Sequence, residues 1–362
     1  MKSKVLIGIT KNLRFAIADT TSIGKLALKE ILEDTFLAKT ELDLITVSAL
    51  LSGNVKGENT KYSIVVKGDK ILGNAKVRNS SDGRIMSSSY FSQEHLTELL
   101  DAIKSNDAKK FSELYSIGEG VVYFEADYGL KYPYVTEIEF NKNDTVSTIV
   151  TDYYEKSEQI PTIIEVSIKE DEDKKTIKKM GGILVQLMPN GDKKIFDKIA
   201  KKINMLHDTA TILSNNFTLE QIAKLIFENV DKRVKREFIE EYKILKTIEL
   251  EYICDCTREK FQDLLIRATS KEELINILKE DGKIEAVCSF CNKPYIFLDE
   301  KVRNDVMKYF DEYTKELMKN DDGNNEIVLL GVGNILLTDE GLGVHVVKEL
   351  KESFSSNKKE DD

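Results

Sequence analysis

Hydrophobic and polar positions along the first 190 residues follow two patterns in irregular succession. Runs rich in β-branched and aromatic residues are typical of strands. Such runs occur at 62–66, 120–124, 135–140 and 162–168. Stretches at 25–37 and 93–104 have helical spacing instead, and Ser92 is placed to cap the second of them. Because strands and helices do not alternate regularly, the pattern favours an α+β fold over a doubly wound parallel sheet.

From about residue 192 to residue 250 the pattern changes to that of helices. Thr218 and Gln221 have the spacing of a capping box. An apolar stripe follows, formed by Ile222, Leu225 and Ile226. Dense mixed charge surrounds the stripe, as in a solvated helical face or in a marginal segment that needs packing against another part of the chain. We therefore predict a core domain over residues 1–204 and a helical linker over residues 205–253.

The cysteine-containing region after the linker has the signals of a small separate unit. Thr257 can cap one helix, and Ser270 with Glu273 forms a second capping box. Short strand-like pieces at 284–287 and 295–298 complete the unit. A unit of roughly 50 residues can barely support a core, so a bound metal would supply the missing stability.

Beyond this unit the chain becomes polar. We expect a zinc-binding domain over 254–302, a polar linker over 303–325 and a further segment over 326–362.

Composition and charge narrow the class of protein. The chain has 362 residues and a formal net charge of −10, which argues against a general nucleic-acid binder. No apolar run approaches the ~20 residues that a membrane span needs, and the apolar stretch near the N-terminus is too short for a signal peptide. We expect a cytoplasmic protein with no membrane or nucleic-acid partner.

The four cysteines suggest a metal site. Cys254 and Cys256 are separated by one residue, and Cys288 and Cys291 form a C-x-x-C pair. Together they have the composition of a closed tetrahedral zinc site, with one Zn²⁺ per chain and no open position for water. Buried inert thiols and a purely structural zinc ribbon are alternative interpretations. A disulfide across one residue closes a small strained ring, which favours a reversible redox role.

Several motifs resemble those of the Hsp33 family of redox-regulated chaperones. The similar segments lie at 153–162, 181–189, 254–261 and 280–291, in the order found in that family. The resemblance covers about residues 1–300.

The resemblance implies a holdase chaperone that is zinc-bound and inactive when reduced. Oxidation would join Cys254 to Cys256 and Cys288 to Cys291 as two redox-active disulfides and release zinc. The zinc domain and the linker would then unfold, bind unfolding client proteins and prevent their aggregation. The oxidised form would be a homodimer. An alternative function is a zinc-ribbon module that binds a protein or nucleic-acid partner.

The end of the chain resembles another family. Residues 326–341 are similar to the first strand and loop of hydrogenase maturation endopeptidases, in which the carboxylate matching Glu340 helps to hold nickel. They are not a dinucleotide fingerprint, because position 336 is leucine. The chain continues only to Asp362, so we expect a truncated segment with no peptidase activity and Glu340 as a vestigial ligand. No catalytic residue is predicted elsewhere.

Overall fold

A computed structural model describes most of the chain up to residue 297. The described residues are 2–31, 35, 37–53, 60–127, 133–172, 176–229, 237–270, 273–274, 276–277 and 283–297. The chain divides into two compact units, Met1–Cys254 and Asp255–Asp362. The expected polar linker at 303–325 and the peptidase-like segment at 326–362, with Glu340, lie outside the described residues. No helix among the described residues is long and apolar enough to span a membrane.

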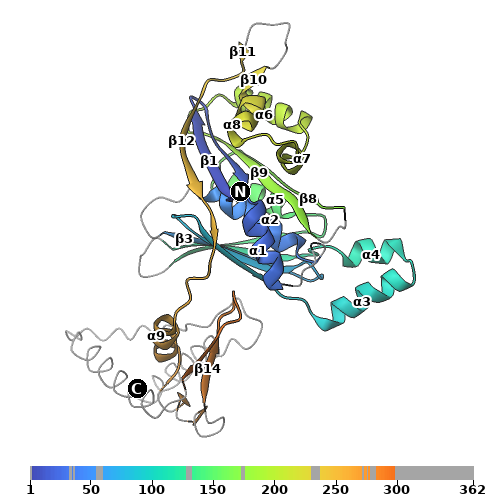
Figure 1. Cartoon of the computed structure of the whole chain (residues 1–362), viewed down its shortest axis with the longest axis vertical. Coiled ribbons are helices and arrows are strands. Elements are labelled where there is room, and N and C mark those ends of the chain that lie inside the picture. Colours follow the sequence, from blue (N-terminus) through green and yellow to red (C-terminus); the bar gives the residue numbers. More distant parts are fainter. Residues whose placement is uncertain are drawn as a thin grey trace, which may run out of the picture. The chain divides into compact units, whose positions relative to one another are not determined.

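Two sheets form the frame of the first unit (Figure 1). The five-stranded sheet is antiparallel, in the order β12-β1-β2-β9-β8. Its strands are β1 (Lys4–Thr10), β2 (Leu13–Asp19), β8 (Thr162–Glu170), β9 (Ile177–Leu187) and β12 (Tyr242–Glu249). The six-stranded sheet has the order β13-β5-β4-β3-β6-β7, and only its β13–β5 pair is parallel. Its strands are β3 (Lys61–Gly68), β4 (Asn74–Ser80), β5 (Arg84–Ser89), β6 (Gly120–Asp127), β7 (Tyr134–Phe140) and β13 (Glu251–Tyr252). The predicted α+β class is confirmed, and the predicted strand runs lie within β3, β6, β7 and β8.

Helices fill the space between the two sheets. They are α1 (Thr21–Ile31), α2 (Lys39–Leu51) and α5 (Val146–Lys156). Helix α2 contacts strands of both sheets, and all its residues after Lys39 are buried. Two hydrogen bonds join buried polar groups of α2 to the six-stranded sheet: Asn79 Nδ2 donates to the Ser48 carbonyl at 2.6 Å, and the Ser87 hydroxyl donates to Glu41 at 2.7 Å. The sequence pattern missed α2, because a helix buried all round has no amphipathic stripe.

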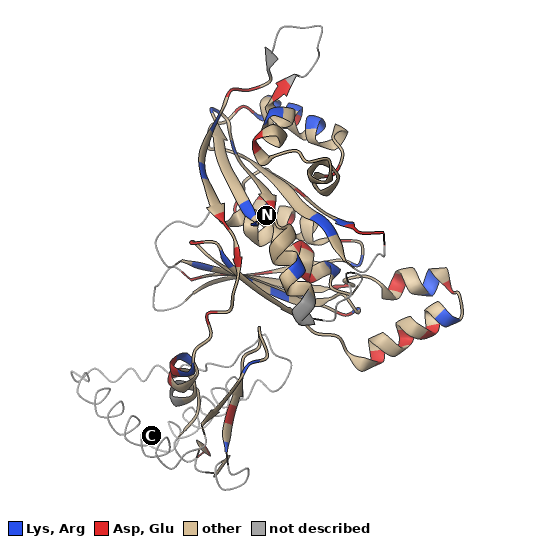
Figure 2. Ribbon diagram, in the orientation of Figure 1, with Lys and Arg blue, Asp and Glu red and all other residues tan. Residues whose placement is uncertain are grey.

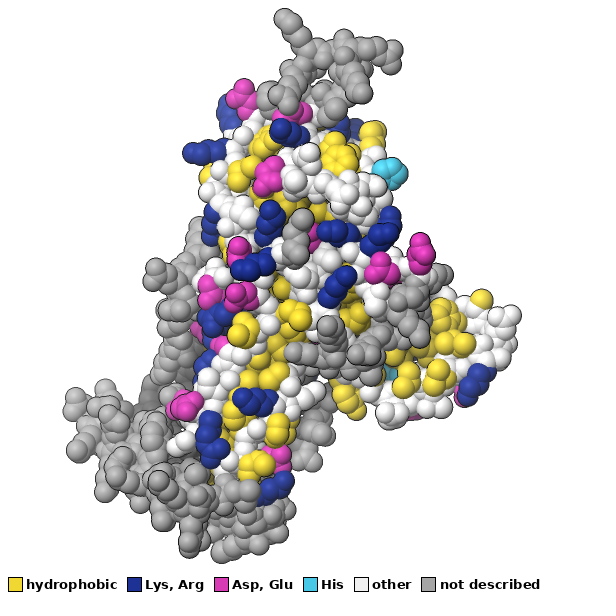
Figure 3. Space-filling model, in the orientation of Figure 1, with side chains coloured by type: hydrophobic (Ala, Val, Ile, Leu, Met, Phe, Trp, Pro, Cys, Tyr) yellow, Lys and Arg dark blue, Asp and Glu magenta, His cyan; other side chains and the backbone are white. Residues whose placement is uncertain are grey.

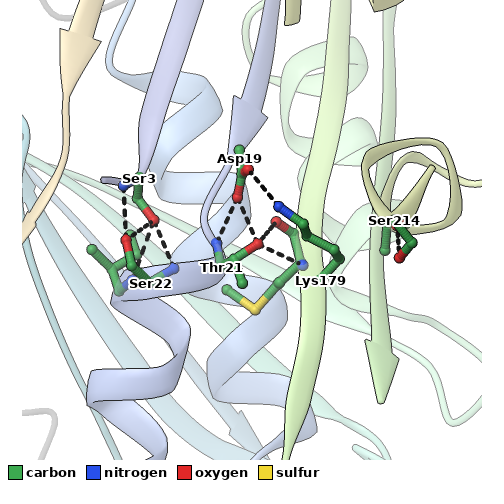
Figure 4. Close-up of polar contacts among 9 residues, drawn as sticks. Ser3, Asp19, Thr21, Ser22, Lys179 and Ser214 are labelled. Carbon is green, nitrogen blue, oxygen red and sulfur yellow. Dashed lines mark hydrogen bonds and ion pairs between the residues drawn. The ribbon is translucent and has the colours of Figure 1, made fainter. Parts of the chain in front are cut away.

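Polar contacts fix the start of α1 against the five-stranded sheet (Figure 4). Asp19 Oδ1 accepts hydrogen bonds from the backbone N–H and the hydroxyl of Thr21, at 3.0 and 2.6 Å. The Asp19 carboxylate also forms an ion pair with Lys179 on β9 at 3.4 Å. The hydroxyls of Ser3 and Ser22 lie 2.8 Å apart and tie the chain before β1 to the same helix. These contacts join β1, α1 and β9.

A second layer of helices covers the other face of the five-stranded sheet. It contains α6 (Lys193–Met205), α7 (Thr209–Ser214) and α8 (Leu219–Phe227). Val5 and Ala16 belong to the core between the sheets, whereas the alternate positions Leu6 and Phe15 belong to the core beneath α6 to α8. Lysines lie along α6 (Figure 2), opposite the buried side chains of that helix. The central strands β1, β2 and β9 are therefore buried on both faces, whereas the edge strand β12 is mostly exposed.

Residues 205–253, the predicted helical linker, contain helices only in their first half. The Thr218–Gln221 capping box is confirmed, and Ile222 and Ile226 of the apolar stripe are fully buried. They pack on β1 and β2, within the first unit. From residue 228 onwards the prediction of helix is wrong, because the described segments are β10 (Glu228–Asn229), β11 (Glu237–Phe238), β12 and β13. The physical reason is the edge of β1, which offers seven residues of antiparallel pairing to a segment rich in isoleucine, threonine and tyrosine.

Helices α3 (Gln93–Lys104) and α4 (Ala108–Leu114) form a hairpin that projects from the two-sheet frame (Figure 1). The predicted cap of α3 is confirmed, since the Ser92 hydroxyl accepts from the His95 N–H at 3.0 Å. Hydrophobic side chains gather on the hairpin's visible face (Figure 3). On α3, Leu100 and Ile103 are about half exposed, while Leu99 is buried.

The second unit contains α9 (Arg258–Ala268) and a hairpin of β14 (Ile284–Val287) and β15 (Pro294–Phe297). The Thr257 hydroxyl accepts from the Lys260 N–H at 3.3 Å and caps α9 as predicted. The second capping box is also confirmed: the Ser270 hydroxyl accepts from the Glu273 N–H, and the Glu273 carboxylate accepts from the Ser270 N–H. The two predicted strands correspond to β14 and β15.

Candidate metal centre

Two short segments carry the four cysteines. Cys254 and Cys256 lie in the extended stretch between β13 and α9. Cys288 follows β14 directly, and Cys291 lies in the turn that leads to β15.

The turn between β14 and β15 is held by backbone hydrogen bonds. The Cys288 N–H donates to the Lys293 carbonyl at 3.0 Å, and the Asn292 N–H donates to the Cys288 carbonyl at 2.8 Å. Asn292 adopts a left-handed conformation with φ of 53°, which asparagine tolerates better than most residues. The backbone of this turn thus brings the C-x-x-C sulfurs to the same side.

The four Sγ atoms form one cluster, all within 4.8 Å of one another. The Cys256 and Cys291 sulfurs are 3.4 Å apart. Cys288 is buried and the other three cysteines are half-buried. Four sulfurs at about 2.3 Å from a tetrahedral zinc are about 3.8 Å from one another. The donor set and its spacing therefore fit one tetrahedral metal ion with small shifts of the side chains.

Tyr295 is a polar neighbour of the cluster that the sequence did not point to. Its hydroxyl donates to Cys256, at 3.1 Å from Sγ and 2.9 Å from the carbonyl oxygen. The hydrogen bond to Cys256 and burial raise the pKa of Tyr295. Its ring stacks on Phe261 of α9, with centroids 4.8 Å apart. A hydroxyl donor to a sulfur ligand orients that ligand and stabilises its thiolate form.

Two charged side chains in the first turn of α9 contact the residues around the cysteines. Arg258 donates to the Ile296 carbonyl at 2.8 Å, and its guanidinium lies over the Phe297 ring at 4.6 Å from the centroid. Lys260 forms an ion pair with Asp255 at 2.8 Å. These contacts link Asp255, which lies between Cys254 and Cys256, to α9, and they link α9 to β15, which follows the turn with Cys291.

The apolar core of the second unit is small. Its buried side chains, among the described residues, are Leu274, Ile284, Cys288, Tyr295 and Phe297. By contrast, both large clusters of buried apolar side chains belong to the first unit, ending at Leu250. The cysteine cluster therefore lies in the part of the described chain that has the least hydrophobic stabilisation of its own.

Across the described residues, no second group of three or more His, Cys, Asp or Glu side chains is arranged to hold a metal ion. Of the histidines, His95 lies in the first turn of α3 and His207 follows α6, and both are far from the cysteines in the sequence. The four cysteines are thus the candidate metal centre of the described chain.

Comparison with known proteins agrees with the motifs and the fold. The model of the Hsp33 protein family matches residues 5–298. A 33 kDa chaperonin of Clostridium botulinum (strain Eklund 17B / Type B) is 28% identical over 316 residues, covering 85% of this chain and 100% of that protein. A 33 kDa chaperonin of Clostridium beijerinckii is 27% identical over 306 residues, covering 83% and 97%.

A solved structure shares the fold. The crystal structure of a 33 kDa chaperonin from Thermotoga maritima superposes with a TM-score of 0.64 at 22% identity, covering 86% of this chain and 99% of that chain. The resemblance inferred from the sequence motifs is confirmed by the family match, which includes all four cysteines. The chain belongs to the Hsp33 family.

Proposed function

We propose that the protein is a redox-regulated holdase chaperone whose switch is the four-cysteine cluster. The observation that carries the proposal is the position of four sulfurs within 4.8 Å in a unit with few buried side chains. Such a unit depends on the state of its thiols for its fold. Membership in the Hsp33 family and the chaperonin relatives support the same function.

In the reduced state we assign one zinc ion to Cys254, Cys256, Cys288 and Cys291. Bound zinc would hold all four sulfurs as thiolates and supply folding free energy of ~10–16 kcal/mol, as in other small metallo-domains. The Tyr295 hydroxyl would then donate to a charged sulfur, a stronger hydrogen bond than to a thiol.

Oxidation converts the ligands into disulfides. We assign the pairs Cys254–Cys256 and Cys288–Cys291. For each pair, two thiols and one peroxide give one disulfide and two waters, with two electrons passing from sulfur to peroxide oxygen. Disulfide sulfurs no longer serve as thiolate ligands, so the metal is released and the second unit loses its main source of stability.

The C-terminal half of the linker connects the cysteines to the two sheets of the first unit. Strand β12 pairs with β1 along an edge, and Leu250 continues with a hydrogen bond from its N–H to the Ser3 carbonyl. Strand β13 pairs with β5 and is followed, after Ile253, by Cys254. Disorder in the second unit would therefore be transmitted first to β13 and β12. Detachment of β12 would expose the edge of β1, where an unfolded client could pair through its backbone.

This route differs from the simpler expectation that the whole linker unfolds together with the zinc domain. The stripe of Ile222 and Ile226 is buried on the five-stranded sheet of the first unit, so loss of the second unit does not by itself expose it. We propose that the client surface begins at β12 and β1 and extends to α8 only when the whole linker is released. Unfolding cytoplasmic proteins are the expected clients, and the oxidised form is expected to be a homodimer.

The deciding experiment is suppression of client aggregation in two redox states. Reduced, zinc-loaded protein should leave a thermally unfolding enzyme to aggregate, and peroxide-treated protein should suppress light scattering. Activity should disappear after reduction with dithiothreitol in the presence of zinc. Ser289→Ala, in the same turn as Cys288 but not a ligand, should behave as wild type. Equal suppression in both states, or none in either state, would contradict the proposal.

A further inference from the structure

A pocket of about 260 Å³ lies in the first unit, separate from the cysteine cluster. Its wall is built by β2, β3, β6, β7 and the end of α5. The volume is slightly below the ~300–1,000 Å³ of pockets for drug-sized ligands. The pocket is therefore sized for a ligand about as large as one aromatic amino acid.

Arg14 supplies a fixed positive charge to this pocket. Its Nε donates to Gln186 Oε1 at 2.7 Å, and Gln186 Nε2 donates to the Thr162 hydroxyl at 3.0 Å. The three residues form one row across β2, β9 and β8, and Gln186 is fully buried. The orientation of the guanidinium is thus set by two strands behind it.

The Arg14 guanidinium interacts electrostatically with the Glu158 carboxylate, which also lines the pocket, but it does not pair with it directly. Its only hydrogen bond to described residues is the one through Nε, and no ion pair joins it to a described carboxylate. Burial lowers the pKa of Arg14, as expected for a partly desolvated cation. An arginine keeps its proton under all ordinary conditions, so a bound anion would add to the partial compensation that Glu158 provides from the rim.

Aromatic side chains form the walls around Arg14. Tyr153 stacks on Phe124 with centroids 3.9 Å apart, and Tyr154 meets Tyr153 edge-on at 5.0 Å. Tyr62 of β3 and Tyr134 of β7 also line the pocket. Such walls favour a flat, apolar body beside the charge.

Two carboxylates border the pocket and limit what it can bind. Glu158 is exposed at the rim, and its carboxylate accepts from the Tyr153 hydroxyl at 2.8 Å. Glu125 borders the pocket, but strand alternation turns its side chain to the face opposite the buried Phe124 and Ala126. The interior charge is therefore positive and the rim is acidic.

From this arrangement we propose that the pocket binds a carboxylate attached to an aromatic body. The carboxylate accepts hydrogen bonds from the terminal nitrogens of Arg14, and the ring lies between the aromatic walls. Two sources have this chemistry: a free aromatic acid, and the C-terminal residue of a peptide. Strand β7 is the outermost strand of its sheet, and its Tyr134 is largely exposed, so a peptide could leave the pocket along that edge.

Titration calorimetry on the full-length, reduced protein tests the proposal. The probes are N-acetyl-phenylalanine and its amide, and an acetylated hexapeptide that ends in phenylalanine with a free or amidated C-terminus. Both free carboxylates, or one of them, should bind roughly 10–100-fold more tightly than the matching amide, because a charge-assisted hydrogen bond is lost on amidation. Binding of the acid alone would point to a small molecule, and binding of the peptide alone would point to a chain terminus.

Variants separate the pocket from the rest of the surface. Arg14→Gln should abolish the preference for the carboxylate, whereas Arg84→Gln, on β5 and ion-paired to Asp82, should leave it unchanged. If Arg14→Gln does not fold, Tyr134→Ala serves instead, because its side chain is largely exposed and its loss should weaken binding of every aromatic probe. Equal binding of acid and amide, unchanged binding by Arg14→Gln and Tyr134→Ala, or no binding of any probe at millimolar concentration would overturn the proposal.

Discussion

Replacement of Cys288 by serine is the sharpest test of how the second unit is held together. Cys288 is the one buried member of the cluster, and its backbone closes the turn between β14 and β15. Serine preserves that backbone but is a poor substitute for a thiolate ligand. The substitution therefore removes one of the four proposed metal ligands and leaves the local hydrogen bonds in place.

The magnitude follows from the composition of the unit. The buried apolar side chains of its described part are Leu274, Ile284, Tyr295 and Phe297. At about 1.5–3 kcal/mol each they contribute ~6–12 kcal/mol before the loss of chain entropy is counted. A structural zinc contributes ~10–16 kcal/mol, at least as much as this burial. If the four ligands share the zinc contribution equally, loss of one ligand costs about 2.5–4 kcal/mol. This cost corresponds to roughly a 10²–10³-fold loss of zinc affinity.

The assay is zinc stoichiometry and affinity, measured by competition with a chromogenic chelator, together with amide exchange over residues 284–297. Cys288→Ser should bind zinc roughly 10²–10³-fold more weakly and should exchange these amides as an unfolded chain does. Ser289→Ala should match wild type in both measurements. The reasoning would be refuted by a Cys288→Ser protein that holds one zinc with unchanged affinity, or by an equal loss in Ser289→Ala.

Two further predictions concern groups that the sequence did not single out. Tyr295→Phe removes the hydroxyl donor to Cys256 and keeps the ring on Phe261, so metal affinity should fall roughly 10–100-fold in the same chelator competition; unchanged affinity would show that the hydroxyl does not tune the sulfur. Glu165 of β8 accepts from the hydroxyl and N–H of Thr209 at the start of α7, and burial raises the pKa of this carboxyl. Its protonated form is thus favoured in the folded state, and the stability this provides is lost as pH rises above the ordinary value of 4.5. The free energy of unfolding of Glu165→Gln, from urea titrations of the first unit, should therefore rise relative to wild type between pH 4 and pH 8, and parallel pH profiles would contradict the assignment.

Local signals in the sequence predicted the elements that have caps and clear periodicity. Ser92, Thr218 and Thr257 each mark the first turn of a helix, because a hydroxyl that accepts a backbone N–H is a purely local interaction. The strands at 120–124 and 162–168 were likewise visible, since their β-branched residues are dense.

Elements whose form depends on distant partners were missed. Helix α2 lies between two sheets and is buried all round, so it has no stripe to detect. The charged residues of segment 242–249 led to its prediction as part of a solvated helix. It forms a strand because it pairs with the edge of β1, more than 230 residues away in the sequence. The contact between Tyr295 and Cys256 was not predicted for the same reason. The Tyr295 hydroxyl lies close to Cys256 only when β15 has paired with β14. Cysteine spacing, by contrast, suggested a shared metal site before any tertiary contact was known, and the structure brings the four sulfurs within 4.8 Å of one another.

The two halves of the linker differ in how firmly the first unit holds them. Helices α7 and α8 are fixed by fully buried Ile222 and Ile226 and by the Thr209–Glu165 contact. Strand β12 is mostly exposed, with Leu245 half in solvent, and it is held mainly by one line of backbone hydrogen bonds. An edge strand of this kind opens at lower cost than a helix packed in a core. Because β12 is also the half connected to Cys254, the part of the linker that is easiest to release is the part that the cysteines can reach. Under the proposed mechanism, a change at the sulfurs would therefore free the edge of β1 while most of the two hydrophobic cores of the first unit remains packed.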